Sequence, residues 1–193
     1  MAIVTENILD IIEDGGEIDM QEDLSAFSSP MNQEIEEFIH SKAIDFAKRK
    51  LSITYLLTDE DDGQLLGYFT LAHKAIEIDG SCLSGSDKKR LSKYANYDQD
   101  TGTYSASAFL LAQFGKNYAV DSGKRITGKE MMEYVMDILA DIQHRIGGGV
   151  VYLDAEDREK LKLFYENEAK YKRFGERVSK ADGVKYLQYM RLF

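Results

Sequence analysis

Apolar residues in the first half of the chain recur in a pattern that predicts one helix followed by a β-hairpin. Residues 28–50 follow helical spacing, and Ser29 with Pro30 has the residue types of a helix N-terminus. Residues 51–59 and 65–78 are rich in β-branched and aromatic residues, and the turn sequence DEDDG separates them. We therefore expect a helix and then two antiparallel strands.

The second half predicts a strand–helix–strand unit in the middle of the fold. Residues 104–116 have a continuous apolar centre, which is typical of a buried strand. A helix that begins near Gly128 places its apolar residues on one side and stops at Gly147, and residues 149–155 follow as a second buried strand. A right-handed crossover makes the two strands parallel neighbours. The remaining predicted elements are short helices within residues 86–94 and 157–167, and strands over residues 171–178 and 185–193.

These elements predict an α/β (α+β) fold, with a mixed, mostly antiparallel sheet that has a central parallel strand pair and is flanked by helices. The length of 193 residues fits one domain with an appendage. We expect residues 1–23 to form an acidic N-terminal appendage, with a helix around 4–13 that is broken at Gly15 and Gly16. Residues 24–193 are then the single domain.

Charge is distributed unevenly along the chain. Residues 1–41 contain eleven Asp/Glu and no Lys/Arg, which leaves 23 acids against 24 bases in the remainder, although the whole chain has a net charge of −10. Neither part has the basic surface of a dedicated nucleic-acid binder. A small basic cluster at residues 87–93 is the main local exception. The acidic first segment is either a peripheral appendage or a partner-binding arm.

Several classes of protein are disfavoured by what the sequence contains. No apolar run approaches the ~20 residues that a membrane-spanning helix needs, so no membrane partner is expected. The single cysteine, Cys82, cannot form an internal disulfide, and no secretory signal is visible, which favours the cytoplasm. The three histidines lack the spacing of metal ligands, so no metal cofactor is expected.

The basic, glycine-containing stretch 123–130 leads directly into the predicted long helix and permits two interpretations. Free N–H groups and the positive end of the dipole make a helix N-terminus suited to phosphate, and Gly128 would let a ligand approach the backbone closely. Alternatively, Thr127 and Glu130 have the spacing of a capping box, which satisfies the same end internally. Both interpretations remain open on the sequence.

The order of elements and three local motifs resemble the GNAT family of acetyl-CoA-dependent N-acetyltransferases over residues 24–193. The family's acetyl-CoA loop, Gln/Arg-x-x-Gly-x-Gly/Ala, is similar to residues 125–130, which read RITGKE. The sequence KLKLFYENEAKYKRFGERV resembles the family's Phe-Tyr helix and following strand. Residues 27–59 with LLGYFTLA are similar to the branch of toxin-type GNATs from toxin–antitoxin pairs. Glu130 departs from the family, which has Gly or Ala there.

The resemblance implies which residues hold acetyl-CoA and which residue acts on it. It implies that the backbone amides of about residues 125–130 cradle the pyrophosphate, with Lys124 and Arg125 adding charge-assisted bonds. It places the pantetheine arm along the third strand, and Gly115 there also fits a β-bulge. It implies that Tyr165 is the general acid that protonates the leaving thiolate. The full set of implied acetyl-CoA-binding residues is Phe114, Gly115, Lys116, Lys124, Arg125, Ile126, Thr127, Gly128, Lys129 and Glu130.

The resulting expectation is an N-acetyltransferase that moves acetyl from acetyl-CoA to a primary amine. Small molecules, proteins and aminoacyl-tRNA remain open as acceptors, and the near-neutral charge of residues 42–193 makes tRNA the less favoured. Glu77, Asp79 and His73 are candidate general bases without a motif to single one out. The alternative is a non-catalytic GNAT-fold binding module, or a toxin–antitoxin component that acts through protein contacts. A homodimer through C-terminal edge strands and an antitoxin-like partner are further expectations.

Overall fold

The computed structural model describes residues 2–180 and 183–193, and these residues form two compact units. Unit 1 contains the residues up to Ala72 and residues 112–136, and unit 2 contains residues 73–111 and 137–193. Hydrogen-bonded strands follow the order β1-β2-β3-β5-β6-β8-β7, and β4 pairs with β5. Strands β3 and β5 each pass through both units. Strand β5 pairs with β6 in parallel, whereas β1 with β2, β2 with β3, β4 with β5, β6 with β8 and β7 with β8 pair antiparallel, which confirms the predicted mixed sheet.

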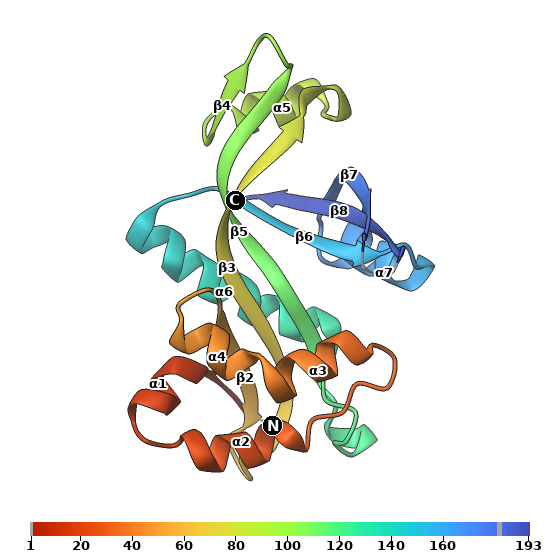
Figure 1. Ribbon diagram of the computed structural model, residues 1–193. Helices are drawn as coiled ribbons and strands as arrows, with labels where there is room; N and C mark the ends of the chain where they lie inside the picture. The colour runs from red at the N-terminus through yellow and green to blue at the C-terminus, as the bar shows by residue number, and fades with distance from the viewer. Residues whose placement is uncertain (1, 181–182) are drawn as a thin grey trace. The chain divides into compact units, whose positions relative to one another are not determined.

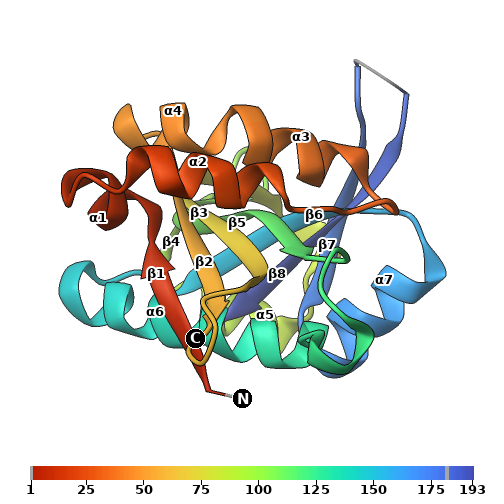
Figure 2. The same cartoon turned by 90° about the horizontal axis from the view of Figure 1, so that it is seen from below.

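Unit 1 has helices on both faces of its strands. Consecutive residues of β3 point to opposite faces, so Gly67 meets Met131 of α6 while Tyr68 faces the N-terminal helices. Tyr68 is fully buried, stacks on Phe38 and donates its hydroxyl to the Ile35 carbonyl at 2.6 Å. Figure 2 shows α2, α3 and α4 side by side over these strands. The elements of unit 1 are β1 Ile3–Asn7, α1 Ile8–Glu13, α2 Glu17–Ser25, α3 Gln33–Ser41, α4 Ala43–Lys48, β2 Ile53–Asp59, the first part of β3 Leu65–Asp79, the last part of β5 Thr103–Lys116, η2 Ser122–Lys124 and the first part of α6 Gly128–Ile146.

The first residues of the chain differ from the prediction. Residues 4–7 belong to strand β1, which pairs with β2, so the helix expected from Val4 begins only at Ile8. Its Asn7 cap accepts a hydrogen bond from the Leu9 N–H at 2.9 Å. Ile8 and Met20 are buried in the core of unit 1, which means that this segment packs into the unit. Five residues are too few for periodicity to separate a strand from a helix.

The helix predicted for residues 28–50 is wrong in its start and in its continuity. It begins at Gln33, because Asn32 rather than Ser29 caps it by accepting from the N–H groups of Glu34 and Ile35. The Ser29 N–H instead donates to the carboxylate of Glu36 at 2.6 Å. The chain then breaks at a single non-helical residue between α3 and α4.

Unit 2 contains the predicted parallel pair and one strand that the sequence did not reveal. Phe109 pairs with Val151 and Leu110 with Tyr152, which confirms the crossover through α6. On its other edge β6 pairs with β8 along its whole length, from Val150 with Leu192 to Glu156 with Tyr186. The short strand β4 was not predicted, because its polar residues are largely exposed. Figure 1 shows α5 and β4 at the end of β3 and β5, and β6, β8 and β7 side by side. The further elements of unit 2 are η1 Gly80–Cys82, α5 Gly85–Leu91, β4 Ala95–Asp98, β6 Val150–Glu156, α7 Glu159–Leu163, the π-helical turn η3 Phe164–Glu168, β7 Lys172–Val178 and β8 Lys185–Leu192.

The core of unit 2 lies between α5 and the strands, where Ile78, Leu91 and Val150 are fully buried. In the part of the chain that the structure describes, no helix is both long enough and apolar enough to cross a membrane.

Candidate functional site

Helix α6 begins with reciprocal hydrogen bonds between Thr127 and Glu130. The Thr127 backbone N–H and hydroxyl donate to one oxygen of the Glu130 carboxylate, at 2.8 and 2.6 Å. The Glu130 N–H donates in return to the Thr127 hydroxyl oxygen at 3.2 Å. These bonds, first the one from the hydroxyl, hold the pKa of Glu130 below its ordinary value. The capping box that the sequence allowed is therefore present.

The capping box leaves two backbone amides at the start of α6 without an intrahelical acceptor. The first N–H groups of an α-helix have no such acceptor, and the Thr127 hydroxyl satisfies only that of Glu130. Gly128 and Lys129 precede Glu130, and neither is buried. Because α6 is 19 residues long, the positive end of its dipole lies at the same place. The capping box and an anion on the amides of Gly128 and Lys129 are thus compatible.

Lys124, which precedes the helix, is engaged by acidic residues at the β2–β3 turn. Its Nζ forms an ion pair with the Asp62 carboxylate and lies 3.7 Å from that of Asp59, which is buried. The hydrogen bond with Asp62 raises the pKa of Lys124, and the same bond lowers the pKa of Asp62. Lys124 therefore ties this loop to the hairpin in addition to any contact it makes with a ligand.

Arg125 braces the loop that leads into α6. It donates from Nε to the Val120 carbonyl at 3.1 Å and from Nη2 to the Tyr118 carbonyl at 3.0 Å, and its guanidinium lies 5.2 Å from the centroid of the Tyr118 ring. The next residue, Ile126, is 1% exposed and anchors the loop in the core. A guanidinium has five N–H donors, so these two bonds fix its position and leave others for a ligand.

Phe114, Gly115 and Lys116 end strand β5 in unit 1. Gly115 is buried, and a Cβ at this position would lie 2.4 Å from Cγ2 of Ile35 in α3. Only glycine allows α3 to pack so closely on the strand. Phe114 and Lys116 are half-exposed. Gly115 therefore has a packing role in the structure, and the β-bulge expected there stays a prediction.

Asn117 holds the turn after β5 in place, although it was not among the residues predicted for the site. Its side chain accepts from the N–H groups of Ser28 and Ala119, both at 3.0 Å, and donates to the Leu65 carbonyl at 2.8 Å. The residue is 5% exposed. An Asn directly after a buried strand is a turn signal, because its side chain readily bonds backbone groups.

Tyr165 lies in unit 2, in the π-helical turn η3. The residue is 7% exposed, and its ring stacks on Tyr189 and packs edge-on against Tyr171, with centroids 5.7 and 6.0 Å apart. Its hydroxyl forms no hydrogen bond with another described residue and is not fully buried, because Ser52 Oγ is the one fully buried side-chain polar atom of the described residues that lacks a partner. Burial, and then the neighbouring Tyr189, raises the pKa of Tyr165 well above its ordinary value. The phenol is therefore protonated throughout the physiological pH range, and π-helical turns are frequent at functional sites.

The tyrosines packed around Tyr165 were also not among the predicted site residues. Tyr189, on β8, donates to the Glu166 carboxylate at 3.1 Å, and burial together with this bond raises the pKa of Tyr189 to about 12. Tyr171 donates its backbone N–H to the Tyr165 carbonyl at 2.8 Å, which helps to fix the turn. Twelve tyrosines in the chain gave no reason to select these two.

Two of the candidate general bases in unit 2 have structural partners. A ring nitrogen of His73 lies 2.9 Å from the Ser107 hydroxyl, and the ring packs against Phe109. Asp79 accepts from the Ser81 N–H at 2.7 Å, and this bond lowers the pKa of Asp79. Glu77 is exposed. The structure brings the loop before α6 together in unit 1 and the tyrosines together in unit 2, and it favours none of these three bases.

Solved structures match almost the whole chain, whereas no protein-family model and no curated protein matches it. AtaT complexed with acetyl-methionyl-tRNAfMet is 15% identical, with a TM-score of 0.64 over 96% of this chain and 94% of that chain. A Tyr-to-Phe mutant of KacT is 16% identical, with a TM-score of 0.65 over the same shares. AtaTR bound with acetyl-CoA is 14% identical, with a TM-score of 0.59 over 98% of this chain and 92% of that chain. These likenesses confirm the predicted GNAT-like fold.

Proposed function

We propose that this protein is an N-acetyltransferase that moves the acetyl group of acetyl-CoA to a primary amine. Proteins with its fold bind acetyl-CoA, as in the AtaTR complex, and one is complexed with an acetylated aminoacyl-tRNA. The chain supplies the two features that the reaction needs. They are a helix start with free amides for the phosphates and a buried phenol for the leaving sulfur.

Coenzyme A binding is assigned to the start of α6. The amides of Gly128 and Lys129 and the dipole of α6 suit the pyrophosphate, and Lys129 is exposed at the same place. The spare N–H donors of Arg125 add charge-assisted bonds. The end of β5, residues 114–116, supplies backbone groups for the pantetheine arm. Glu130 is held against Thr127 by its cap bonds, so its carboxylate does not occupy the amides of Gly128 and Lys129.

The observation that carries the catalytic assignment is the phenol of Tyr165, whose ring is buried in turn η3 and whose hydroxyl forms no hydrogen bond with a described residue. The amine nitrogen attacks the thioester carbonyl, the C–S bond breaks, and the sulfur takes the proton of the Tyr165 hydroxyl while the attacking amine gives up its own. A thiol has an ordinary pKa near 8.5 and a phenol near 10. Because burial makes Tyr165 a still weaker acid, its proton transfer has to be coupled to loss of the amine proton, which returns to the phenol through water.

The acceptor is assigned as a primary amine on a small molecule, a protein or an aminoacyl-tRNA. The complex of AtaT with acetyl-methionyl-tRNAfMet supports the last of these, and the near-neutral charge of residues 42–193 weighs against it. Other neighbours are complexes of the AtaT toxin with the C-terminus of its antitoxin AtaR, which supports an antitoxin-like partner for this chain.

The test is to incubate the purified protein and labelled acetyl-CoA with cell extract, in parallel with and without RNase. We expect label in an amine of one class: RNase-sensitive material, protein or small molecules. Acetyl-CoA at 100 times its Kd should also stabilise the fold by about 2.7 kcal/mol in a thermal shift measurement. No transfer, together with no shift at millimolar acetyl-CoA, would favour a non-catalytic binding module.

A further inference from the structure

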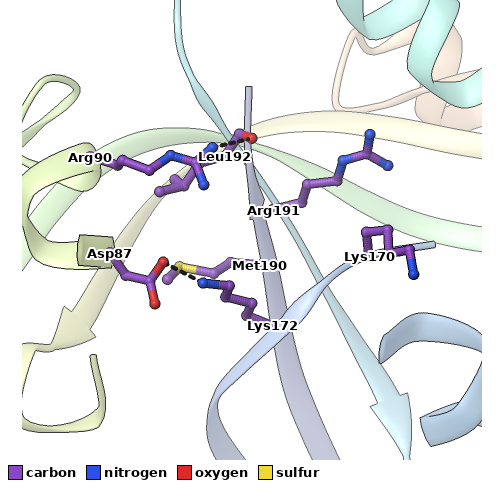
Figure 3. Close-up of a pocket in the computed structure, with 7 residues that line it drawn as sticks. All are labelled: Asp87, Arg90, Lys170, Lys172, Met190, Arg191 and Leu192. Carbon is purple, nitrogen blue, oxygen red and sulfur yellow. Dashed lines mark hydrogen bonds and ion pairs between the residues drawn. The ribbon is translucent and has the colours of Figure 1, made fainter. Parts of the chain in front are cut away.

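A cationic pocket in unit 2 is not explained by the binding of acetyl-CoA. The pocket has a volume of about 220 Å³, and Met190 and Leu192 form its apolar wall. Figure 3 shows Arg90 reaching from α5 to the side of β8 on which Met190 and Leu192 lie, whereas Arg191 leaves β8 on the other side. Its charged lining residues are Asp87, Arg90, Lys170, Lys172 and Arg191.

The charges in the pocket do not cancel. Lys172 Nζ pairs with the buried Asp87 carboxylate at 2.6 Å, and the Ser84 hydroxyl also donates to Asp87 at 2.6 Å. Arg90, Lys170 and Arg191 form no ion pair with a carboxylate of the described residues. Four cations against one carboxylate leave three positive charges. Unit 2 as a whole carries 16 Lys/Arg and 15 Asp/Glu, so this charge is concentrated locally and does not reflect a basic surface.

Both arginines are held in position before any ligand binds. Arg90 donates from Nη2 to the Leu192 carbonyl at 3.1 Å, and Arg191 donates from Nη1 to the Ala169 carbonyl at 2.9 Å. One bond each leaves most of the five N–H donors of each guanidinium for a ligand. Planar guanidinium groups fixed in this way match the oxygens of phosphate, with which they form paired hydrogen bonds.

Lys170 has a backbone conformation that a lysine rarely adopts. Its φ is 61°, and the only other described non-glycine residue with positive φ is Lys50, at 56°. Such a conformation is strained for a residue with a Cβ, and glycine would relieve the strain. A lysine that lines a cationic pocket at the cost of strain suggests that its charge is needed there.

The pocket adjoins the turn that holds Tyr165. Ala169, whose carbonyl binds Arg191, donates its N–H to the Phe164 carbonyl at 2.9 Å and so closes η3. Tyr171, between pocket residues Lys170 and Lys172, donates its N–H to the Tyr165 carbonyl. A group bound in the pocket therefore lies beside the residues that position the phenol.

We propose that this pocket binds a phosphate group carried by the amine acceptor. Three uncompensated positive charges in a pocket for one group exceed the single charge of a carboxylate and suit a phosphate. The identification of the ligand as the acceptor rests on the proposed acetyl transfer, whereas the phosphate site itself does not. The phosphate belongs either to a small phosphorylated amine or to the nucleotide of an aminoacylated RNA.

The first test measures binding of inorganic phosphate to the full chain through backbone amide chemical shifts, with acetate as the control anion. We expect phosphate, but not acetate, to shift the amides of residues 88–91, 169–173 and 190–192. Lys170→Gly should weaken this binding about 5- to 10-fold, because one of four cations is lost. Lys50→Gly, which relieves the same type of strain in unit 1, should leave it unchanged. Both variants should raise Tm by about 2–4 °C, which shows that each is folded.

Equal phosphate affinity in the Lys170→Gly and Lys50→Gly variants would overturn the proposal, as would shifts confined to unit 1. The second test treats the cell extract with phosphatase or with RNase before acetyl transfer. Loss of the acceptor after phosphatase identifies a small phosphomonoester, and loss after RNase identifies RNA. An acceptor that survives both treatments contradicts its assignment as the phosphate carrier. If no acetyl transfer occurs while phosphate still binds the pocket, the proposed function fails and the phosphate site stands.

Discussion

Replacing Glu130 with glutamine should strengthen coenzyme A binding. In the structure the Glu130 carboxylate accepts two bonds from Thr127 at the start of α6, next to the amides of Gly128 and Lys129. A glutamine amide oxygen can accept the same two bonds, so the cap is largely retained, whereas the negative charge is removed. We therefore expect the effect to appear in ligand affinity more than in stability.

The size of the effect follows from the exposure of Glu130. A unit charge about 7 Å from a phosphate charge interacts by roughly 0.6 kcal/mol in a water-like medium. With the two charges of a pyrophosphate, the repulsion is about 1 kcal/mol, or roughly a fivefold change in Kd at low salt. Because the pKa of Glu130 is lowered, its carboxylate is charged throughout the range from about pH 5 to 8. The difference in Kd between Glu130→Gln and wild type should therefore be constant over this pH range.

Isothermal titration calorimetry with coenzyme A, at low and at high ionic strength, measures this difference. Glu133→Gln is the matched control, because Glu133 is an exposed acid of the same helix that forms no cap bond. We expect Glu130→Gln to bind about fivefold more tightly at low salt, less so at high salt, and Glu133→Gln to remain closer to wild type. Unchanged or weaker binding by Glu130→Gln at low salt would refute coenzyme A docking at the start of α6.

Three further predictions concern stability. Gly115→Ala should destabilise the fold by about 1–3 kcal/mol in a urea titration, because its Cβ would overlap Ile35, and an unchanged midpoint would contradict the packing described here. Asn117→Ala should lower the free energy of unfolding by about 2–3 kcal/mol in the same titration, because it leaves buried partners such as the Leu65 carbonyl without a hydrogen bond. A decrease below about 0.5 kcal/mol would argue against this role of Asn117. The raised pKa values of Tyr165, Tyr171 and Tyr189 contribute stability that is fully present below pH 10, the ordinary pKa of a phenol, and is lost as pH rises through the folded-state values. Stability that stayed constant from pH 9 to pH 12 would contradict that sign.

The crossover of the fold could be predicted because its signals are local and strong. The apolar runs of β5 and β6 and the one-sided apolar pattern of α6 each span enough residues to define their type, and the parallel pairing followed from the handedness of crossovers. Strand β1 and the start of α3 could not be predicted in the same way. Residues 3–7 form a strand because they pair with β2. The start of α3 depends on which of several polar residues caps the helix.

The candidate site was predictable where it has a motif and not where it depends on distant partners. The Thr127–Glu130 cap can be read from spacing alone, and the structure contains it. The engagement of Lys124 by Asp62, 62 positions away, leaves no trace in local sequence. The same holds for the packing of Tyr189 against Tyr165, because strand β8 meets the turn only in the folded chain.

The central claim is that Tyr165 delivers a proton to the leaving sulfur, and the most direct measurement compares turnover with acetyl-CoA affinity in Tyr165→Phe. Loss of an unpartnered hydroxyl should leave the fold intact, and the Kd for acetyl-CoA should stay within about twofold. General-acid catalysis contributes typically ~10²–10⁴-fold, so turnover should fall by at least about a hundredfold. Tyr189→Phe, which removes the neighbouring hydroxyl, should turn over at close to the wild-type rate. Turnover by Tyr165→Phe at the wild-type rate, with acetyl-CoA bound, would remove the phenol from the mechanism.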